Sequence, residues 1–401
     1  MDLIQPLALE WLGTLVRWVH VLAAIMWIGD SFLFMWLDST LERPRQPRTG
    51  DAAGEIHLVH SGGFYEVVKR RSLTPAELPP NLYAFKWQAY TTWLSGACLI
   101  MIVYWLGGGG LLVESGARLS HGQAVALSAG SLGAAWLVYD LACRSPLGQR
   151  PRLLTGVLSV VLVGAIMGFT QVLGARAAWL QVGAMLGTVM AANVLTVIVP
   201  GQKHMLAQTA AGLPVDTSHG VRAKVRSTHN HYLTLPVLFM MLSQHFPSGY
   251  GHPASGLVLV LMIVFGVVLK YVMNARSRSD RRVVSLGVAA LTVAITLTVR
   301  TGHGGLASAA PALAVPDEQA LAIVQRRCTT CHAEHPSNPS FPEAPNGVKL
   351  DGLDRLLAHA DRVQVRAIDT RTMPLGNLTG MTEAERDTLA AWLAHRPGTT
   401  R

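Results

Sequence analysis

The chain has 401 residues, of which 50% are hydrophobic and only 14% are charged. This is the composition of a membrane protein and excludes an ordinary soluble or disordered chain. The formal net charge of +9 is largely explained by an excess of Lys and Arg in the loops on one side of a membrane, so we expect no nucleic-acid partner.

Eight apolar segments, each close to the length that crosses a hydrocarbon core of roughly 30 Å, follow one another over the first three quarters of the chain. The first is too long for a signal peptide and lacks a cleavage site, so we expect a retained helix. The sixth is the shortest and carries Pro236, so we expect it to bend or to line a wet cavity. The predicted spans are 11–37, 89–106, 123–141, 153–173, 178–199, 232–246, 255–273 and 283–299.

The basic residues between the spans are distributed unevenly. The first, third, fifth and seventh loops hold 18 Lys and Arg residues, whereas the even loops and the N-terminal segment hold two, Arg118 and Arg176. Because cytoplasmic loops carry the excess of Lys and Arg, this asymmetry predicts that both termini lie outside and that the odd loops are cytoplasmic.

The run Cys328-Thr329-Thr330-Cys331-His332 is the attachment signature of a c-type haem, in which both thiols bond to the porphyrin and the histidine ligates iron. No second cysteine or histidine pair follows to complete a zinc site. Met373, which precedes Pro374 on a predicted loop, suits the second axial ligand. The alternatives to Met373 are Met381, His335 and His359.

Composition and periodicity divide the chain into three parts. We expect an eight-helix transmembrane domain over 1–301, a flexible linker rich in Gly, Ala, Pro and Ser over 302–315, and a cytochrome c domain over 316–401. In the last part helical patterns cover 317–327 and 382–394, and Thr382 with Glu385 forms a predicted capping box. Two terminal helices over a haem are the plan of a small class I-like cytochrome c, so the predicted fold class is all-α.

Haem c is joined to protein on the outer face of the bacterial inner membrane, which is where the charge asymmetry places this motif. The predicted location is therefore the bacterial inner membrane, with several passes through the bilayer and with the N-terminus and the cytochrome domain in the periplasm.

Ionisable side chains within apolar spans are costly and mark candidate functional sites. His20, in the first span, is a candidate ligand of a second haem, a proton carrier or a packing histidine. His229, Asn230 and His231 open the sixth span, and at least one of them is expected to face a cavity. On a regular helix His229 and His231 point about 200° apart, so they cannot share one metal ion. His245 and His303 fall at the outer face.

The first loop, 38–86, is too long for a connector. Its residues His57 and His60 share a face if the segment is helical, and Lys86 lies among aromatic residues before the second span. A cation beside aromatic rings suits a flat anionic heterocycle. An interfacial aromatic belt with a snorkelling lysine is the alternative interpretation of Lys86.

Several long motifs resemble those of the bacterial integral-membrane, cytochrome c-linked urate oxidase family. The resemblance implies eight helices with an outward haem domain, and oxidation of urate to 5-hydroxyisourate with electrons entering the respiratory chain. The family's catalytic residues are not carried over, so His229, His231, His60, Asn230 and Lys86 are catalytic candidates on chemical grounds alone. The motifs lie at 18–20, 27–29, 60–65, 85–96, 229–236 and 373–382.

The sequence thus predicts a membrane-bound urate oxidase of the dehydrogenase type, with Cys328, Cys331, His332 and Met373 holding haem c. The expected partners are urate, the lipid bilayer and a downstream respiratory cytochrome or terminal oxidase. If urate binds near Lys86 and His229, a non-covalent haem b on His20 is the expected relay; the rival is a cavity open outward, near His245 and His303. A membrane-anchored electron carrier or quinol-linked dehydrogenase without urate activity, and a transporter with an accessory cytochrome, are the alternatives.

Overall fold

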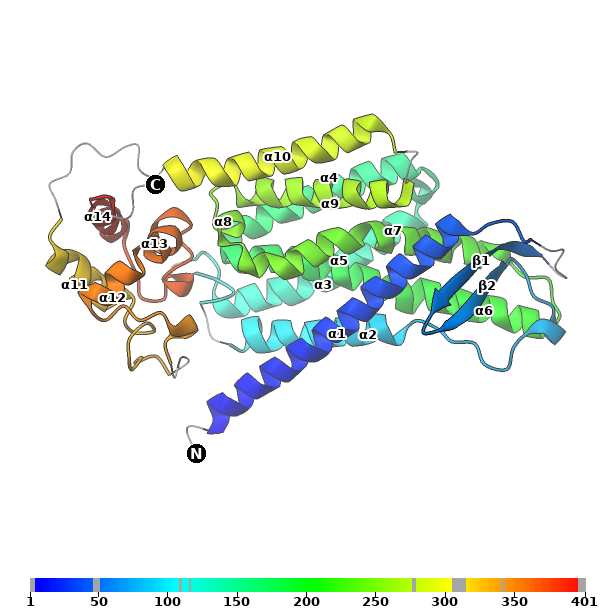
Figure 1. Ribbon diagram of the computed structural model, residues 1–401, viewed down its shortest axis with the longest axis horizontal. Helices are drawn as coiled ribbons and strands as arrows, with labels where there is room; N and C mark the ends of the chain where they lie inside the picture. The colour runs from blue at the N-terminus through cyan, green and yellow to red at the C-terminus, as the bar shows by residue number, and fades with distance from the viewer. Residues whose placement is uncertain are drawn as a thin grey trace.

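The computed structural model describes residues 4–45, 51–107, 110–114, 117–275, 279–304, 315–339, 341 and 343–395. A bundle of long helices carries a two-stranded hairpin at one end and a small helical domain at the other (Figure 1). The N-terminal end of the first helix lies at the same end as the small domain, and the hairpin lies at the opposite end (Figure 1). This arrangement agrees with an even number of membrane crossings between the N-terminal end of the first helix and the small domain.

The long helices follow the predicted spans closely at most of their ends. Within the part of the chain that the structure describes, six of them are long and apolar enough to cross a membrane: those at Trp11–Thr40, His121–Arg144, Pro151–Val172, Ala175–Ala210, Ser255–Asn274 and Arg281–Val299. The helices and π turns of the bundle are α1 (Ile4–Thr40), α2 (Trp87–Ile100), η2 (Met101–Trp105), α3 (His121–Arg144), α4 (Pro151–Val172), α5 (Ala175–Asn193), η4 (Val194–Ile198), α6 (Val199–Ala210), α7 (Thr217–Leu242), α8 (Pro247–Tyr250), α9 (Ser255–Ala275) and α10 (Arg281–Gly304).

The second and sixth predicted spans correspond to α2 and α7, which are not among those six. α7 begins at Thr217, well before the predicted start, and continues through Pro236 to Leu242. α7 is longer than the apolar stretch predicted as the sixth span because its first half is polar, which hydropathy does not register. Arg226, which the charge count assigned to a loop, lies within α7 and is 5% exposed.

The first long loop contains an antiparallel hairpin of β1 (Ala52–His60) and β2 (Gly63–Arg70). The turn uses positive φ angles at Ser61 (49°) and Gly62 (75°), the backbone that favours a tight two-residue hairpin connection. The all-α prediction was therefore wrong for this segment, since alternating residues of 52–70 build strands. His57 and His60, predicted to share a helix face, project to opposite faces of a strand because their spacing is odd.

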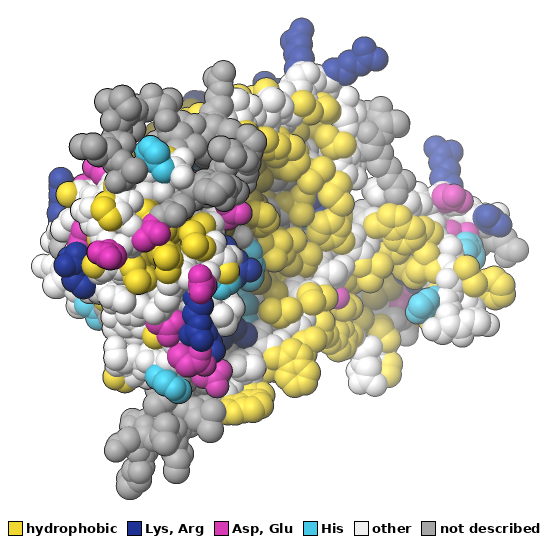
Figure 2. Space-filling view, turned by 60° about the vertical axis from the view of Figure 1, so that its left-hand side comes forward, with side chains coloured by type: hydrophobic (Ala, Val, Ile, Leu, Met, Phe, Trp, Pro, Cys, Tyr) yellow, Lys and Arg dark blue, Asp and Glu magenta, His cyan; other side chains and the backbone are white. Residues whose placement is uncertain are grey.

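Hydrophobic side chains cover the outside of the bundle, whereas charged side chains gather on the small domain and near the hairpin (Figure 2). On α1, Trp11 is 61% and Trp18 is 65% exposed. Exposure of such large apolar side chains is unfavourable in water but not in lipid. The buried core lies between α3, α4, α5, α7 and α9, where Trp179, Ile166, Met240 and Leu259 are fully enclosed.

The small domain has its own core and its own helices. These are α11 (Asp317–Arg327), α12 (Leu353–Ala358), α13 (Ala360–Val363) and α14 (Glu383–Ala394). α11 and α14 confirm the two predicted helices, and Thr382 forms the predicted capping box with Glu385. Their apolar faces, with Val324, Leu389 and Trp392, make the core. The predicted linker lies mostly outside the described residues, although α10 continues to Gly304, three residues into it.

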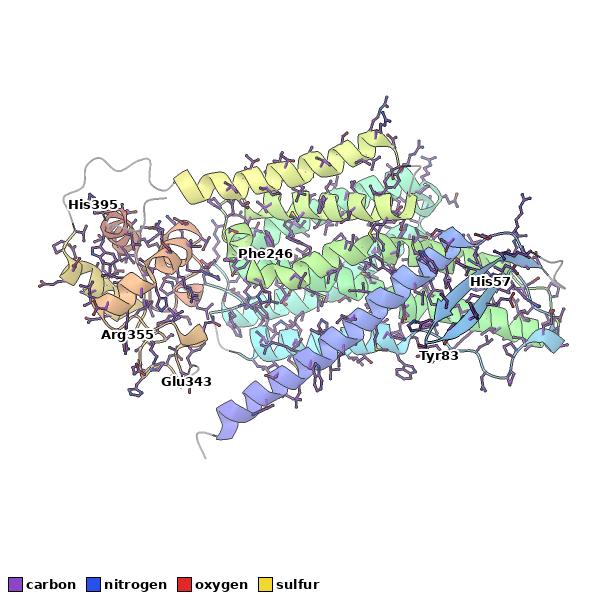
Figure 3. All side chains as sticks on the ribbon, viewed as in Figure 1. His57, Tyr83, Phe246, Glu343, Arg355 and His395 are labelled. Atoms are coloured by element: carbon purple, nitrogen blue, oxygen red, sulfur yellow. The ribbon has the colours of Figure 1, made fainter. Side chains whose placement is uncertain are left out.

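The small domain contacts the end of the bundle nearest to it. A Cβ atom on Gly110 would lie 2.7 Å from Cγ of Leu378, and one on Gly376 would overlap the carbonyl oxygen of Gly110. Gly376 also has a φ of 55°, so glycine is required there for conformation and for contact. Phe246, which follows α7, lies at this same end of the bundle, far from His57 on the hairpin (Figure 3).

Candidate functional site

The cysteine-histidine motif forms a tight turn at the end of α11. The amide of Cys328 donates to the carbonyl of Val324 (2.8 Å), and the amide of His332 donates to that of Cys328 (2.9 Å). Nδ1 of His332 lies 3.0 Å from the carbonyl oxygen of Val348. Because a carbonyl only accepts, Nδ1 carries the proton and Nε2 keeps its lone pair, as in a histidine that ligates a metal.

The two thiols lack the lowered pKa that is typical of a redox-active pair. Burial raises the pKa of Cys328 to about 12, and it also raises the pKa of Cys331. Reactive Cys-x-x-Cys pairs have a lowered thiol pKa instead. The spacing of the two half-buried cysteines and the hydrogen bond that orients His332 therefore fit the residues that would hold a covalent haem.

Met373 lies on a loop whose backbone is held at both sides. Its amide donates to the carbonyl of Arg366 (2.9 Å), and its carbonyl accepts from the guanidinium of Arg386 (2.9 Å), which is itself buried. The Met373 side chain is half-buried, whereas the alternative Met381 is 3% exposed and belongs to the domain core. Of the other two alternatives, His335 is exposed and His359 is half-buried. Met373 therefore remains the favoured thioether ligand.

The terminal helices of the small domain are clamped together by polar contacts. The indole of Trp392 donates to Asp317 (2.8 Å), and Arg327 of α11 pairs with Glu385 of α14 (3.0 Å). Burial alone would raise the pKa of Glu385, but the amide of Thr382 and the guanidinium of Arg327 outweigh it and hold this pKa below its ordinary value. The clamp fixes the helix that carries the haem motif.

Two of the predicted catalytic residues, His229 and Asn230, belong to a buried polar network between α3, α5 and α7. In its centre Arg226 pairs with Asp140 (2.7 Å), and Arg226 also donates to the side chain of Asn193 (3.2 Å). Asn193 donates to Asn230 (2.9 Å), while the hydroxyl of Tyr139 lies 2.7 Å from Nδ1 of His229. We call this set, Tyr139, Asp140, Asn193, Arg226, His229 and Asn230, the inner network.

His231 lies outside the inner network and contacts α1 and α9. Its Nδ1 accepts from the hydroxyl of Ser31 (2.9 Å), and its Nε2 donates to Asn274 (3.1 Å). Beside it Lys270, 1% exposed, has its ammonium 3.2 Å from the ring centroid of Phe32. His229 and His231 therefore use different partners, as their predicted divergence on a regular helix requires.

His20 packs between α1 and α2. Its Nδ1 lies 2.9 Å from the carbonyl oxygen of Thr92 and 3.1 Å from the hydroxyl of Ser95. A Cβ atom on Gly96 would lie 2.9 Å from Cε1 of His20, so only glycine leaves room for the ring. Nδ1 thus holds the protein contacts, and Nε2 is the nitrogen available to a ligand.

His60 and Lys86 lie away from the buried histidines. His60 is exposed at the tip of the hairpin, where it pairs in register with Gly63. Lys86 precedes α2, and its ammonium lies 5.4 Å from the ring centroid of Trp87, which matches the interfacial interpretation. The five predicted catalytic residues are therefore divided among the inner network, the α1–α9 contact of His231 and two surface positions.

The sequence reasoning missed three ionisable residues inside predicted spans or beside them: Asp140, Lys270 and Arg17. All three would have been found by the rule that was applied to His20, that charges within apolar spans are costly. Their burial differs, since Asp140 and Lys270 are buried and Arg17 is exposed.

Comparison with known protein families gives one match, which covers most of the chain. The family model described as urate oxidase N-terminal matches residues 6–301. No curated protein and no solved structure matches this chain.

Proposed function

The chain belongs to the urate oxidase N-terminal family, and we propose that it is a membrane-bound urate oxidase that passes electrons to a haem c held by its own C-terminal domain. The family match supports urate as the substrate and an oxidation as the reaction. The electron acceptor is proposed from Cys328, Cys331 and His332, whose spacing, partial burial and hydrogen bonding suit covalent haem.

The proposed reaction is a dehydrogenative hydroxylation. Urate and one water give 5-hydroxyisourate, two protons and two electrons, and no oxygen is consumed. A haem c supplies one-electron acceptance when bound, so each urate oxidised accounts for two one-electron reductions. The protein has to bind an anion, accept a proton and bring the substrate close to the small domain.

The small domain supplies the residues for the haem and for its orientation. Nε2 of His332 and Sδ of Met373 would ligate the haem iron, and the carbonyl of Val348 fixes the imidazole by accepting from Nδ1. The Arg327–Glu385 pair and the Trp392–Asp317 bond hold α11 against α14, and so keep the motif in place.

We propose the bacterial inner membrane as the location, with all eight predicted spans crossing and the small domain in the periplasm. The support is the apolar surface of the bundle (Figure 2), the six helices of membrane-spanning length and the concentration of Lys and Arg in the odd loops. A downstream respiratory cytochrome or terminal oxidase is the proposed acceptor from the small domain.

The predicted catalytic residues on α7 receive little support from their contacts. His229 and Asn230 already bond to protein partners in the inner network, and His231 bonds to Ser31 and Asn274. A hydrogen-bonded buried network rigidifies a core, and these bonds engage Nδ1 of His229, the side chain of Asn230 and both ring nitrogens of His231. We therefore assign no step of the reaction to these residues, nor to the exposed His60 and the peripheral Lys86.

Anaerobic mixing of urate with the purified, oxidised protein tests the proposal. We expect the haem c absorption to shift to the reduced form with urate, at one urate per two haems, and not with xanthine or allantoin. Reduction by quinol but not by urate would favour a membrane-anchored electron carrier instead. A pyridine haemochrome assay on the same sample measures the proposed haem c and shows whether haem b accompanies it, which is the test of the His20 relay.

A further inference from the structure

Arg386 is a cation buried inside the small domain. It lies in the second turn of α14, and its side chain is 5% exposed. An arginine is rarely buried to this extent unless it is paired with an acid, because removing its charge from water is costly. Among the residues that the structure describes, however, Arg386 forms no salt bridge. Its charge is therefore not cancelled by a direct acidic partner.

The guanidinium of Arg386 joins two backbone segments that precede α14. Its Nη1 donates to the carbonyl of Ala367 and to that of Met373 (2.9 Å). Ala367 belongs to the π turn η8 (Gln364–Asp369), and the amide of Met373 donates to Arg366 of the same turn (2.9 Å). The backbone of Met373 is thus held at its amide by η8 and at its carbonyl by the arginine that also bonds to η8. Groups that orient a metal ligand in this way commonly change the metal affinity of the site 10–100-fold.

The charge of Arg386 also reaches the first cysteine of the haem motif. Arg386 acts electrostatically on the thiol of Cys328. In the proposed protein Cys328 would bond to the porphyrin and Met373 would ligate its iron. The buried guanidinium therefore acts on two residues that would hold the haem, although the two come from opposite ends of the small domain's sequence.

The other charges that act on Arg386 are exposed to water. Two carboxylates, Glu383 and Glu114, and one cation, Arg371, lie within electrostatic range of it. All three are exposed, and Glu383 pairs with Arg371 (2.9 Å). Because water and salt screen exposed charges much more than buried ones, the guanidinium of Arg386 is the least screened charge of this group.

A buried cation favours the reduced state of a nearby redox group. Reduction adds one negative charge, whose attraction to a cation is stronger in the low dielectric of a protein interior than in water. The axial ligand, the hydrogen bonds around it and burial are the features through which a protein sets the potential of a haem. Arg386 contributes to two of these features, since it bonds to the Met373 loop and carries a buried charge.

We infer that Arg386 is a positioning residue for the haem c, which fixes the Met373 ligand loop against η8 and raises the reduction potential through its charge. The presence of the haem rests on the proposed function. A higher potential makes the haem a better acceptor of the two electrons that leave urate one at a time. Of the basic residues of the small domain, Arg386 is thus the one whose charge acts on electron uptake.

Two substitutions in the full-length protein loaded with haem separate the charge from the hydrogen bonds. Arg386→Gln removes the charge and keeps an amide donor. Arg386→Lys keeps a charge but lacks the planar fork that bonds to two carbonyls at once. Arg362→Gln, which removes an exposed charge from the same domain, is the matched control.

Spectroelectrochemical titration measures the effect of the charge. R386Q should lower the equilibrium constant for haem reduction at least tenfold, which is about 59 mV for a one-electron couple, whereas R386K and R362Q should stay within about threefold of the wild type. Titration of the oxidised protein with imidazole, which competes with Met373 for the iron, measures the hold on the loop. The Kd for imidazole should fall roughly tenfold or more in R386Q and R386K, and R362Q should keep the wild-type value.

Each measurement can overturn one part of the inference. An unchanged potential in R386Q, or an equal shift in R362Q, would refute the role of the buried charge. An unchanged Kd for imidazole in both Arg386 variants would refute the positioning of Met373. Should R386Q not take up haem, R386K decides alone, because a lowered potential or an unchanged Kd for imidazole in that variant contradicts the inference.

The same samples keep this inference apart from the proposed function. If the wild-type protein carries haem c that urate reduces, while the Arg386 variants match it in potential and in imidazole binding, the role of Arg386 is wrong and the proposed function stands. If the wild-type protein carries no haem c, or its haem is not reduced by urate, the proposed function fails.

Discussion

The buried pair between Asp140 and Arg226 allows the role of the inner network to be measured. Both side chains are 7% exposed, their closest atoms are 2.7 Å apart, and the guanidinium also lies 4.8 Å from the ring centroid of Tyr139. Asp140→Ala leaves the Arg226 guanidinium among helices with only neutral partners. Breaking a buried pair on one side typically costs about 3–5 kcal/mol, which corresponds to a fall in Tm of roughly 6–20 °C in a domain of this size class.

The assay is thermal unfolding of the detergent-solubilised protein, followed by tryptophan fluorescence at fixed detergent and protein concentration. Asp140→Ala and Arg226→Met should each lower Tm strongly. The double variant should be less destabilised than the sum of the two, because no uncompensated charge remains. Urate binding per folded molecule should stay near the wild-type value. Single variants that unfold at the wild-type temperature, or that unfold normally but lose urate binding, would refute the structural role.

Three further predictions concern packing, docking and pH. Gly96→Ala places a methyl group 2.9 Å from the His20 ring and should destabilise the α1–α2 contact by about 1–3 kcal/mol, measured as a lower Tm. Gly376→Ala forces a positive φ on alanine against the bundle and should slow haem reduction by urate at least tenfold while urate still binds. The partners of Glu385 lower its pKa in the folded protein. The stabilisation from the Arg327–Glu385 clamp is therefore fully present above the unfolded pKa of about 4.3 and is lost as pH falls through the folded pKa. Glu385→Gln should flatten the acid transition that this loss produces in the haem spectrum.

Each of these changes has a matched control. Gly29→Ala on the same helix as His20, and Gly352→Ala in the small domain, meet no atom within 4 Å and should leave Tm and haem reduction unchanged. Glu383→Gln removes a carboxylate that is 65% exposed and should leave the acid transition as it is in the wild type. If a control variant changed Tm, haem reduction or the acid transition as much as its test variant does, the corresponding contact would not explain the effect.

The sequence predicted the elements whose signals are local. The capping box at Thr382 and the apolar repeat before Cys328 define α14 and α11 from neighbouring residues alone. The first half of α7 was missed, since its polar residues bury themselves only against side chains that are distant in sequence, as Arg226 does with Asp140. The hairpin was missed for a different reason: the spacing of His57 and His60 was examined at the helical period, while residues 52–60 and 63–70 pair as antiparallel strands.

Some functional residues could likewise be named from local sequence, whereas others could be found only in the folded chain. The haem motif is contiguous, so its residues could be named from the sequence, although the bond from His332 to Val348 could not. Asp140, Asn193 and Arg226 come from three separate helices, and no motif joins them. Their contacts with one another are a property of the folded chain and not of any segment of it.

The contact between Gly110 and Gly376 bears on how the proposed enzyme works. In the proposed enzyme the small domain has to lie close to the bound urate for electron transfer, and has to pass the electrons on to an acceptor. Backbone contact at Gly110 keeps the Met373 loop against the bundle, because any side chain at Gly376 would push that loop away. Thr370 lies against Gly251 of the bundle as well, so the docked face includes residues on both sides of Met373. We therefore expect a change at Gly376 to act on the transfer of electrons into the domain.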